Sequence, residues 1–284
     1  MAEGVEIVEM GPRDGLQNEP RLIPLEEKVA LVNCLSRVGF RRIEVASFVS
    51  PKWVPQMADS AAVLAGIRRQ AGVSYAALTP NLKGYEGARA AKADEVAIFA
   101  SASEGFSRAN LNCSISESIE RFRPVSKAAL ADNVRVRGYV SMVTDCPFDG
   151  PTAPGAVARV VAALRDLGCY EVSLGDTVGR GQPDSIDRML GAVLNELPPD
   201  RLAGHYHDTG GRALENIAVS LGRGLRVFDA SVGGLGGCPY APGAKGNVAS
   251  ERVEAQLRSL GYDTGLDPRL LAEAALFARS LVTG

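Results

Sequence analysis

The sequence lacks the features that mark membrane, secreted and nucleic-acid-binding proteins. No uninterrupted apolar run reaches the roughly 18–20 residues needed to span a bilayer. Residues 1–10 carry three glutamates and no basic cluster, so they predict neither a secretory signal nor a transit peptide. Balanced Lys+Arg and Asp+Glu leave a formal net charge of −2, which gives no general attraction to nucleic acid or to an anionic membrane.

Cysteine is scarce, and its spacing is not that of a structural site. The five cysteines are an odd number, lie far apart and include no CxxC pair, which excludes a zinc ribbon. A chain of 284 residues, 46% of them hydrophobic, is long enough to bury a core without disulfides. These features favour a reducing, cytoplasmic setting.

Short β-branched runs alternate with longer amphipathic stretches along the whole chain. Several of the amphipathic stretches end in a glycine, where a helix would stop. Eight strands that alternate with helices, at about 30–35 residues per unit, favour parallel βα units closed into a barrel. The glycines are Gly39, Gly168, Gly224 and Gly261, and the strands are predicted over 5–9, 41–48, 73–78, 95–101, 134–142, 171–176, 202–207 and 226–234.

The alternative to a barrel is an open, doubly wound sheet. Its usual phosphate-binding signal, GxGxxG directly after the first strand, is missing, because the first strand runs into GPRDG at 11–15. The tail from about Asp267 reads as one more helix outside the repeat. We therefore predict the α/β class, with residues 1–284 forming a single catalytic (β/α)8 TIM-barrel domain that carries an additional C-terminal helix.

Polar residues gather at the predicted carboxyl ends of the strands. In a barrel these ends face one mouth, where the chemistry is assembled. Charged groups inside a buried parallel sheet are costly unless they are paired or bind a metal, so the gathering indicates a site. The residues are Arg13, Asp14, Glu44, Asn81, Ser101, Ser103, Arg137, Ser173, Asp176, His205, His207 and Cys238.

His205 and His207 form the sharpest local signal, and they are the chain's two histidines. Residues i and i+2 of a strand share a face, so both imidazoles can point inward while Tyr206 points to the helices. With Asp14 as a third, oxygen-bearing ligand, the set suits a divalent cation with open positions. The alternative is a metal-free, hydrogen-bonded pair in the barrel core.

Two further motifs have a functional and a structural interpretation. Arg13 beside Asp14 suits stabilisation of negative charge on a substrate oxygen, but Arg-Asp in a Gly/Pro-bounded loop is also a common salt-bridged turn. In the loop 233–247, rich in glycine, Cys238 could exchange a proton, or the loop could be plain flexible surface. Asn247 ends that loop and is first a helix N-cap candidate, then a metal ligand.

Residues on other loops of the same face carry weaker signals. Trp53 follows the second strand, and we expect it to pack part of the mouth. Lys52, Lys83 and Arg108 could meet phosphates, although solvated surface charge is the more common role for such residues.

Seven segments together resemble 3-hydroxy-3-methylglutaryl-CoA lyase, in order and in spacing. HxHD and RDG alone mark the wider superfamily of metal-dependent lyase and synthase barrels, whereas SPKWVPQM and the glycine-rich loop are more specific to the lyase. The segments are GPRDGLQNE, IEVASFVSPKWVPQM, LTPNLKGYEGA, NCSISES, GCYEVSLGDTVG, GHYHDTGG and GGLGGCPYAPGAKGN.

The resemblance implies a role for each matching residue. It implies that Arg13 contacts the thioester oxygen, Glu44 supports the site and Cys238 is the catalytic thiol. Either His205 or Asp14 would act as the base, and we expect Gln17 and Arg137 to contact substrate as Arg13 does. The implied ligands of a divalent cation, Mg or Mn, are Asp14, His205, His207 and Asn247.

The resemblance also implies an activity, the cleavage of (S)-3-hydroxy-3-methylglutaryl-CoA to acetoacetate and acetyl-CoA in leucine degradation, by a homodimer. The nearest alternative is a lyase for a longer-branched substrate such as 3-hydroxy-3-isohexenylglutaryl-CoA. A condensing synthase that uses acetyl-CoA is less favoured, because the chain carries the Cys238 loop. A barrel without catalytic activity, acting as a scaffold, is the alternative from another class.

Overall fold

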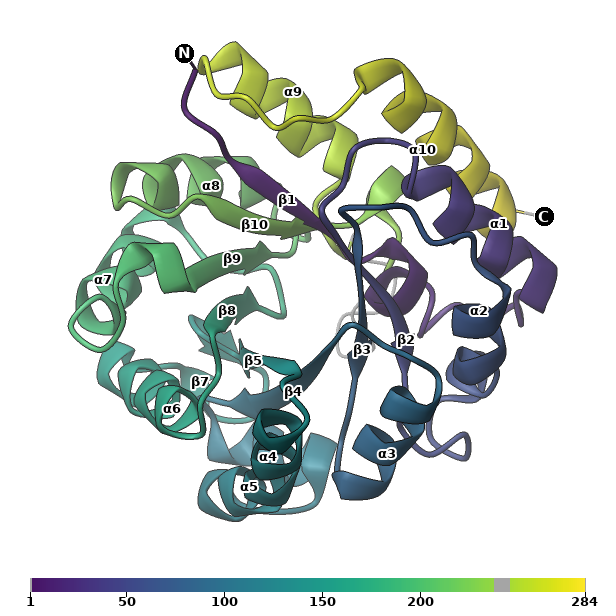
Figure 1. Cartoon of the computed structure of the whole chain (residues 1–284). Coiled ribbons are helices and arrows are strands. Elements are labelled where there is room, and N and C mark those ends of the chain that lie inside the picture. The colour runs from purple at the N-terminus through teal and green to yellow at the C-terminus, as the bar shows by residue number, and fades with distance from the viewer. Residues whose placement is uncertain (1, 238–245, 284) are drawn as a thin grey trace.

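Eight parallel strands close into a barrel in the computed structural model, which describes residues 2–237 and 246–283 (Figure 1). The order around the barrel is β1-β2-β3-β4-β5-β8-β9-β10, closed by pairing of β10 with β1. Each strand falls inside one of the predicted ranges, so the predicted barrel is confirmed. The strands are β1 Glu6–Glu9, β2 Arg42–Ser47, β3 Ser74–Leu78, β4 Glu95–Ser101, β5 Arg135–Ser141, β8 Glu171–Asp176, β9 Leu202–Tyr206 and β10 Val227–Ala230.

Helices surround the barrel (Figure 1). Apolar side chains fill the layer between the helices and the strands. No helix in the described part of the chain combines the length and the apolar character needed to cross a membrane. The helices are α1 Leu25–Leu35, α2 Ser60–Gly66, α3 Leu82–Ala90, α4 Glu104–Leu111, α5 Ile115–Ala131, α6 Pro154–Asp166, α7 Pro183–Val193, α8 Ala213–Gly222, α9 Ser250–Ser259 and α10 Pro268–Val282.

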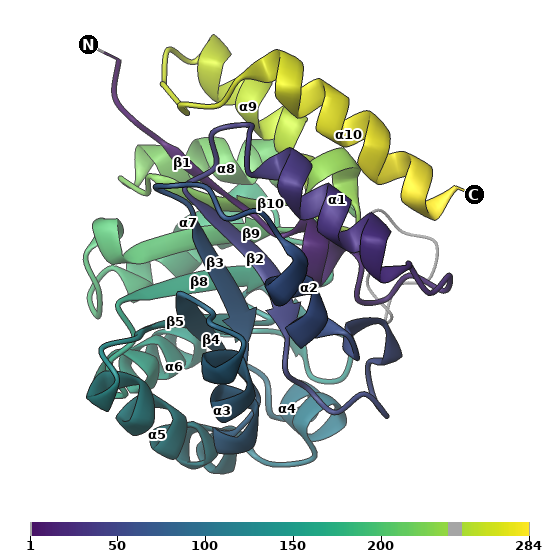
Figure 2. The ribbon, with the colours of Figure 1, turned by 45° about the vertical axis from the view of Figure 1, so that its right-hand side comes forward.

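The predicted additional C-terminal helix is α10, which lies outside the ring against α1 and α9 (Figure 2). Asp267 caps it, because its carboxylate accepts hydrogen bonds from the backbone N–H groups of Arg269 and Leu270. Six small elements of the described chain were not predicted. They are the hairpin of β6 Asp145–Cys146 with β7 Gly150–Pro151 and the short helical turns Gly11–Gly15, Pro55–Met57, Pro199–Arg201 and Val232–Gly234.

The inside of the barrel holds paired charges as well as apolar side chains. Arg42 donates to Glu171 (2.8 and 3.2 Å), and Arg137 donates to both Glu171 (2.7 Å) and Asp229 (2.8 Å). All four side chains are buried, and removing one partner would leave an uncompensated charge in a medium of low dielectric. The pairs form a charged column, Arg42–Glu171–Arg137–Asp229.

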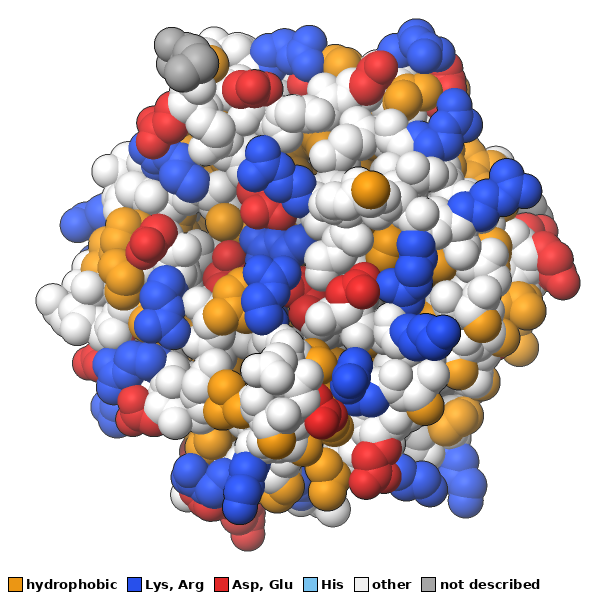
Figure 3. Space-filling model, in the orientation of Figure 1, with side chains coloured by type: hydrophobic (Ala, Val, Ile, Leu, Met, Phe, Trp, Pro, Cys, Tyr) orange, Lys and Arg blue, Asp and Glu red, His pale blue; other side chains and the backbone are white. Residues whose placement is uncertain are grey.

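Charges on the surface are mixed in sign. Figure 3 shows basic and acidic side chains next to one another across the face seen in Figure 1. Among the described residues drawn on this face, no large area carries one sign alone. This mixing agrees with the formal net charge of −2.

The glycines predicted to end helices have the conformation that this role requires. The φ values are +114° for Gly39, +92° for Gly168, +93° for Gly224 and +85° for Gly261. All four lie in the left-handed region that glycine adopts without strain. Gly39 also lies close to another segment, because a Cβ added there would meet the carbonyl oxygen of Gly265 at 2.5 Å.

Replacing Gly39 should therefore destabilise the fold. We expect Gly39→Ala to lower the free energy of unfolding by about 1–3 kcal/mol, since it combines a disfavoured φ with a clash. The matched control is Gly191→Ala within α7, where an added Cβ meets nothing within 4 Å. That change should stabilise the protein by up to about 1 kcal/mol. Urea unfolding measures both, and equal values for the two variants would contradict this account.

Candidate active site

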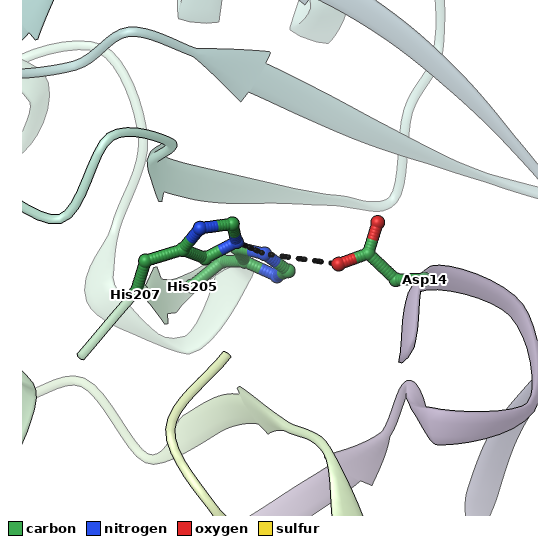
Figure 4. Close-up of side chains that lie close together, drawn as sticks. All are labelled: Asp14, His205 and His207. Atoms are coloured by element: carbon green, nitrogen blue, oxygen red, sulfur yellow. Dashed lines mark hydrogen bonds and ion pairs between the residues drawn. The ribbon is translucent and has the colours of Figure 1, made fainter. Parts of the chain in front are cut away.

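Two imidazoles lie side by side at the carboxyl end of β9 (Figure 4). The Nε2 atoms of His205 and His207 are 3.3 Å apart. Tyr206, between them, points the other way, and its hydroxyl makes a 2.8 Å hydrogen bond with Ser220 on α8. The predicted alternation along the strand is confirmed, and it brings both rings to the inside of the barrel.

Asp14 faces the two imidazoles from the helical turn that follows β1 (Figure 4). Pro12 suits the first turn of a helix, and Gly15 lets this turn lie against Ser231, since a Cβ on Gly15 would lie 2.7 Å from Ser231 Oγ. Asp14 Oδ2 comes within 3.8 Å of His205 Nε2. Burial works to raise the pKa of Asp14, but Arg13 and His205 beside it lower that pKa to about 2, so the side chain is a carboxylate.

The spacing of these atoms suits a divalent cation. One ligand atom from each of Asp14, His205 and His207 lies within 4.8 Å of the other two. An octahedral ion with bonds of about 2.1 Å holds neighbouring ligand atoms about 3.0 Å apart and opposite ones about 4.2 Å apart. The 3.3 Å separation is close to the distance between neighbouring ligand atoms, and the 3.8 Å separation lies between the two values. These three residues could hold such an ion.

Asn247 belongs to the same cluster. Its amide nitrogen donates to Asp14 Oδ2 at 2.7 Å, and residue 247 forms a β-bridge with His207. Turning the amide over would direct its oxygen to the same place. The first interpretation of Asn247, as a helix N-cap, is wrong, because α9 begins at Ser250 and its N-cap position is Ala249.

Arg13 connects the candidate metal ligands to a second buried group, Glu44 with Tyr139. Its Nε donates to Glu44, while its Nη1 donates to Asp14 Oδ1 at 2.6 Å. Glu44 also accepts a hydrogen bond from Tyr139, a residue that the sequence analysis did not single out. Burial opposes the charge of Arg13, but Glu44 and Asp14 hold its pKa above the ordinary value, so it stays cationic. Gln17 donates to Asp14 Oδ1 at 2.8 Å.

A buried aspartate lies beneath the histidines. Asp229 Oδ2 is 3.1 Å from His205 Nδ1, and its other oxygen accepts from Arg137. Arg137 is 2% exposed, and its guanidinium also donates to Glu171 and to Tyr139. The structure thus places Arg137 below the histidines. Asp229 is not among the predicted site residues, although a charge inside a buried strand is costly and was the available signal in the sequence.

The two histidines differ in their electrostatic surroundings. Burial works to lower the pKa of His205, but the hydrogen bond and charge of Asp229 raise it above its ordinary value. Burial and the neighbouring His205 lower the pKa of His207 to about 4, so this imidazole is neutral. A neutral imidazole is the form that binds a metal ion.

Other predicted site residues lie elsewhere or have structural partners. Asn81 caps α3 by accepting from Gly84 N–H, and Asp176 accepts from Thr144 and from Gly181 N–H. The expectation that Trp53 packs the mouth is wrong, since its side chain is 85% exposed in a turn after β2. Cys238 lies outside the described residues. The remaining residues are Ser101 at the end of β4, Ser103 at the N-cap of α4, Ser173, which donates to Asp229, and the exposed Lys52, Lys83 and Arg108.

Fold and site together define the class: a (β/α)8-barrel protein with a candidate divalent-cation site at the carboxyl ends of its strands. The model of the HMGL-like family matches residues 4–277, almost the whole chain. The chain belongs to the HMGL-like family.

Relatives of known name agree with this membership. A "3-hydroxy-3-isohexenylglutaryl-CoA/hydroxy-methylglutaryl-CoA lyase" of Pseudomonas aeruginosa is 58% identical, over 95% of this chain and 90% of its own. The hydroxymethylglutaryl-CoA lyase of Pseudomonas mevalonii is 52% identical, over 96% and 91% of the two chains. The crystal structure of the HMG-CoA lyase from Brucella melitensis is 63% identical, with a TM-score of 0.99 over 100% of both chains.

The geometry of the cluster predicts how metal affinity responds to substitution. His207→Ala should weaken Mn²⁺ binding at least about 10-fold, because it removes a direct ligand and even outer partners of a ligand are worth that much. Tyr206→Phe is the matched control, since it alters the same strand on the face turned away from the cluster. Calorimetric titration with Mn²⁺ measures both, and unchanged affinity in a folded His207→Ala protein would exclude His207 as a ligand.

Proposed function

We propose that this protein cleaves (S)-3-hydroxy-3-methylglutaryl-CoA to acetoacetate and acetyl-CoA by a retro-Claisen reaction, as a carbon–carbon lyase of leucine degradation. The observation that carries this proposal is the Asp14, His205 and His207 group in a chain that matches HMG-CoA lyases along nearly its full length. The substrate chemistry suits that group, because breaking the C–C bond requires a deprotonated tertiary hydroxyl and a stabilised thioester enolate.

The proposed cofactor is a divalent cation, Mg²⁺ or Mn²⁺, held by Asp14, His205, His207 and Asn247. Such an ion, when bound, lowers the pKa of a hydroxyl group next to it. Carboxylate, amide oxygen and neutral imidazole form a mixed donor set that these ions accept. The contact between Asn247 and Asp14 supports the inclusion of Asn247.

The protein's own residues would handle the charge and the proton of the cleavage step. His205 or Asp14 takes the proton of the tertiary hydroxyl. The C2–C3 bond then breaks, its electron pair moves to the thioester as an enolate, and the oxygen becomes the ketone of acetoacetate. Arg13, fixed by Glu44 and cationic, faces the same cluster and would stabilise the enolate oxygen, which is worth a few kcal/mol where the geometry is preorganised.

Cys238 is the proposed acid of the last step, in which the enolate carbon receives a proton to give acetyl-CoA. The support is the resemblance of its loop, 233–247, to that of the lyases. A thiol titrates close enough to neutral pH to give up a proton there.

The remaining proposals concern the wider setting. The partner is an acyl-CoA, and Gln17 and Arg137 remain proposed substrate contacts, although in this structure Gln17 donates to Asp14 and Arg137 to Asp229. We also propose that residues 1–284 form one catalytic domain, that it assembles as a homodimer, and that it acts in the cytoplasm. Resemblance to the lyase family supports these three points.

The direct test is a coupled assay of acetyl-CoA release from HMG-CoA. We expect turnover with Mg²⁺ or Mn²⁺ and its loss with EDTA, restored when the metal is added back. Metal binding without turnover would contradict the proposed substrate. The isohexenyl analogue is then the next substrate to assay, because the Pseudomonas aeruginosa relative carries both substrates in its name. If the protein shows neither turnover nor metal binding, a scaffold without catalytic activity is favoured.

A substitution at Cys238 tests the proposed acid. Cys238→Ser should leave KM nearly unchanged and remove most of kcat, because a serine hydroxyl is a far weaker acid than a thiol. Cys34→Ser is the matched control, a free cysteine on α1 that should keep full activity. Steady-state kinetics decides the matter, and an unchanged kcat in Cys238→Ser would remove the residue from the mechanism.

A further inference from the structure

The buried Asp229 is the group that lies directly behind a candidate metal ligand. It belongs to β10, in register with His205 on the neighbouring β9. One carboxylate oxygen of Asp229 is 3.1 Å from His205 Nδ1, while the other His205 nitrogen, Nε2, faces Asp14 and His207. Asp229 therefore contacts the ring of His205 on the side away from the candidate metal position.

A carboxylate in this position dictates which nitrogen of His205 carries the proton. An ionised carboxylate only accepts hydrogen bonds, so Nδ1 must be the donor. In the neutral ring, Nε2 then has no proton and presents its lone pair to Asp14 and His207. The opposite tautomer would direct an N–H group into the place where a cation should bind.

Asp229 is itself held in place and kept ionised. Arg137 donates to Oδ1 at 2.8 Å, and Ser173 donates to Oδ2 at 2.7 Å. Burial works against the charge, but Arg137 and His205 hold the pKa of Asp229 well below its ordinary value. Arg137 is fixed in turn by Glu171 at 2.7 Å. Three hydrogen-bonding side chains therefore hold the carboxylate with Oδ2 directed at His205.

We propose that Asp229 is the positioning residue of the candidate metal site, which keeps the proton of His205 on Nδ1 and its Nε2 lone pair free for the cation. Asp229 touches neither the cation nor the substrate and acts through His205. The proposal rests on the metal site proposed above but not on the identity of the substrate.

Nitrogen NMR tests this directly, because the chain contains two histidines. Protein labelled with ¹⁵N-histidine is prepared free of metal at about pH 9, above the ordinary histidine pKa. His207→Ala assigns the signals by removing one set. In the unsubstituted protein we expect the proton of His205 on Nδ1. A proton on Nε2 would overturn the proposal, whatever any variant does.

Asp229→Asn supplies the second readout. The amide can direct an N–H group at His205 Nδ1, so we expect the proton of His205 to move to Nε2 and the Mn²⁺ affinity to fall about 10- to 100-fold. The control is Glu6→Gln, which removes the ion pair of Glu6 with Arg42 at the far end of the charged column. It should change neither the tautomer of His205 nor the affinity.

Each outcome of this comparison decides the proposal. A folded Asp229→Asn protein with wild-type tautomer and Mn²⁺ affinity would overturn it, and so would an equal loss of affinity in Glu6→Gln, which would indicate a general effect on the barrel. If Asp229→Asn does not fold, the spectrum of the unsubstituted protein still decides. Neither readout involves the substrate, so failure here is separate from failure of the proposed lyase activity.

Discussion

The ion pair between Arg137 and Asp229 connects the packing of the barrel to the geometry of its mouth. Both side chains are almost fully buried, and each supplies the other with an opposite charge in a medium of low dielectric. On one side Arg137 continues through Glu171 to Arg42, and on the other Asp229 continues to His205. Because each member has its partners, the column is rigid, and the position of His205 follows from the interior of the barrel rather than from a loop.

Local patterns in the sequence predict most of this fold, because strand alternation and helix stops are properties of neighbouring residues. The inward face of His205 and His207 could be predicted for the same reason, since it needs only the alternation of a strand. Asp229 and Tyr139 could not be assigned roles in this way. The partners of Asp229 lie on other strands, and so does Glu44, to which Tyr139 donates. Only the closed barrel shows which of these groups meet.

The predictions that the structure contradicts are those that depend on the path of a loop. Trp53 was expected to pack the mouth on the strength of its position after a strand, yet it is largely exposed. Asn247 was first interpreted as a cap because a helix was expected to begin directly after it, whereas α9 begins three residues later, at Ser250. In both cases the strand or helix was correctly identified, but the path of the connecting backbone depends on side chains far away in sequence.

The candidate ligands come from distant parts of the sequence. Asp14 follows β1, His205 lies in β9 with His207 directly after that strand, and Asn247 precedes α9. The barrel closes where β1 pairs with β10, beside β9. During synthesis on the ribosome, a nascent chain therefore carries the carboxylate long before it has the imidazoles. The cluster first exists once the last strands pair with the first. An ion bound there would stabilise the contact between the first and last strands, and would favour the complete barrel over any partial barrel.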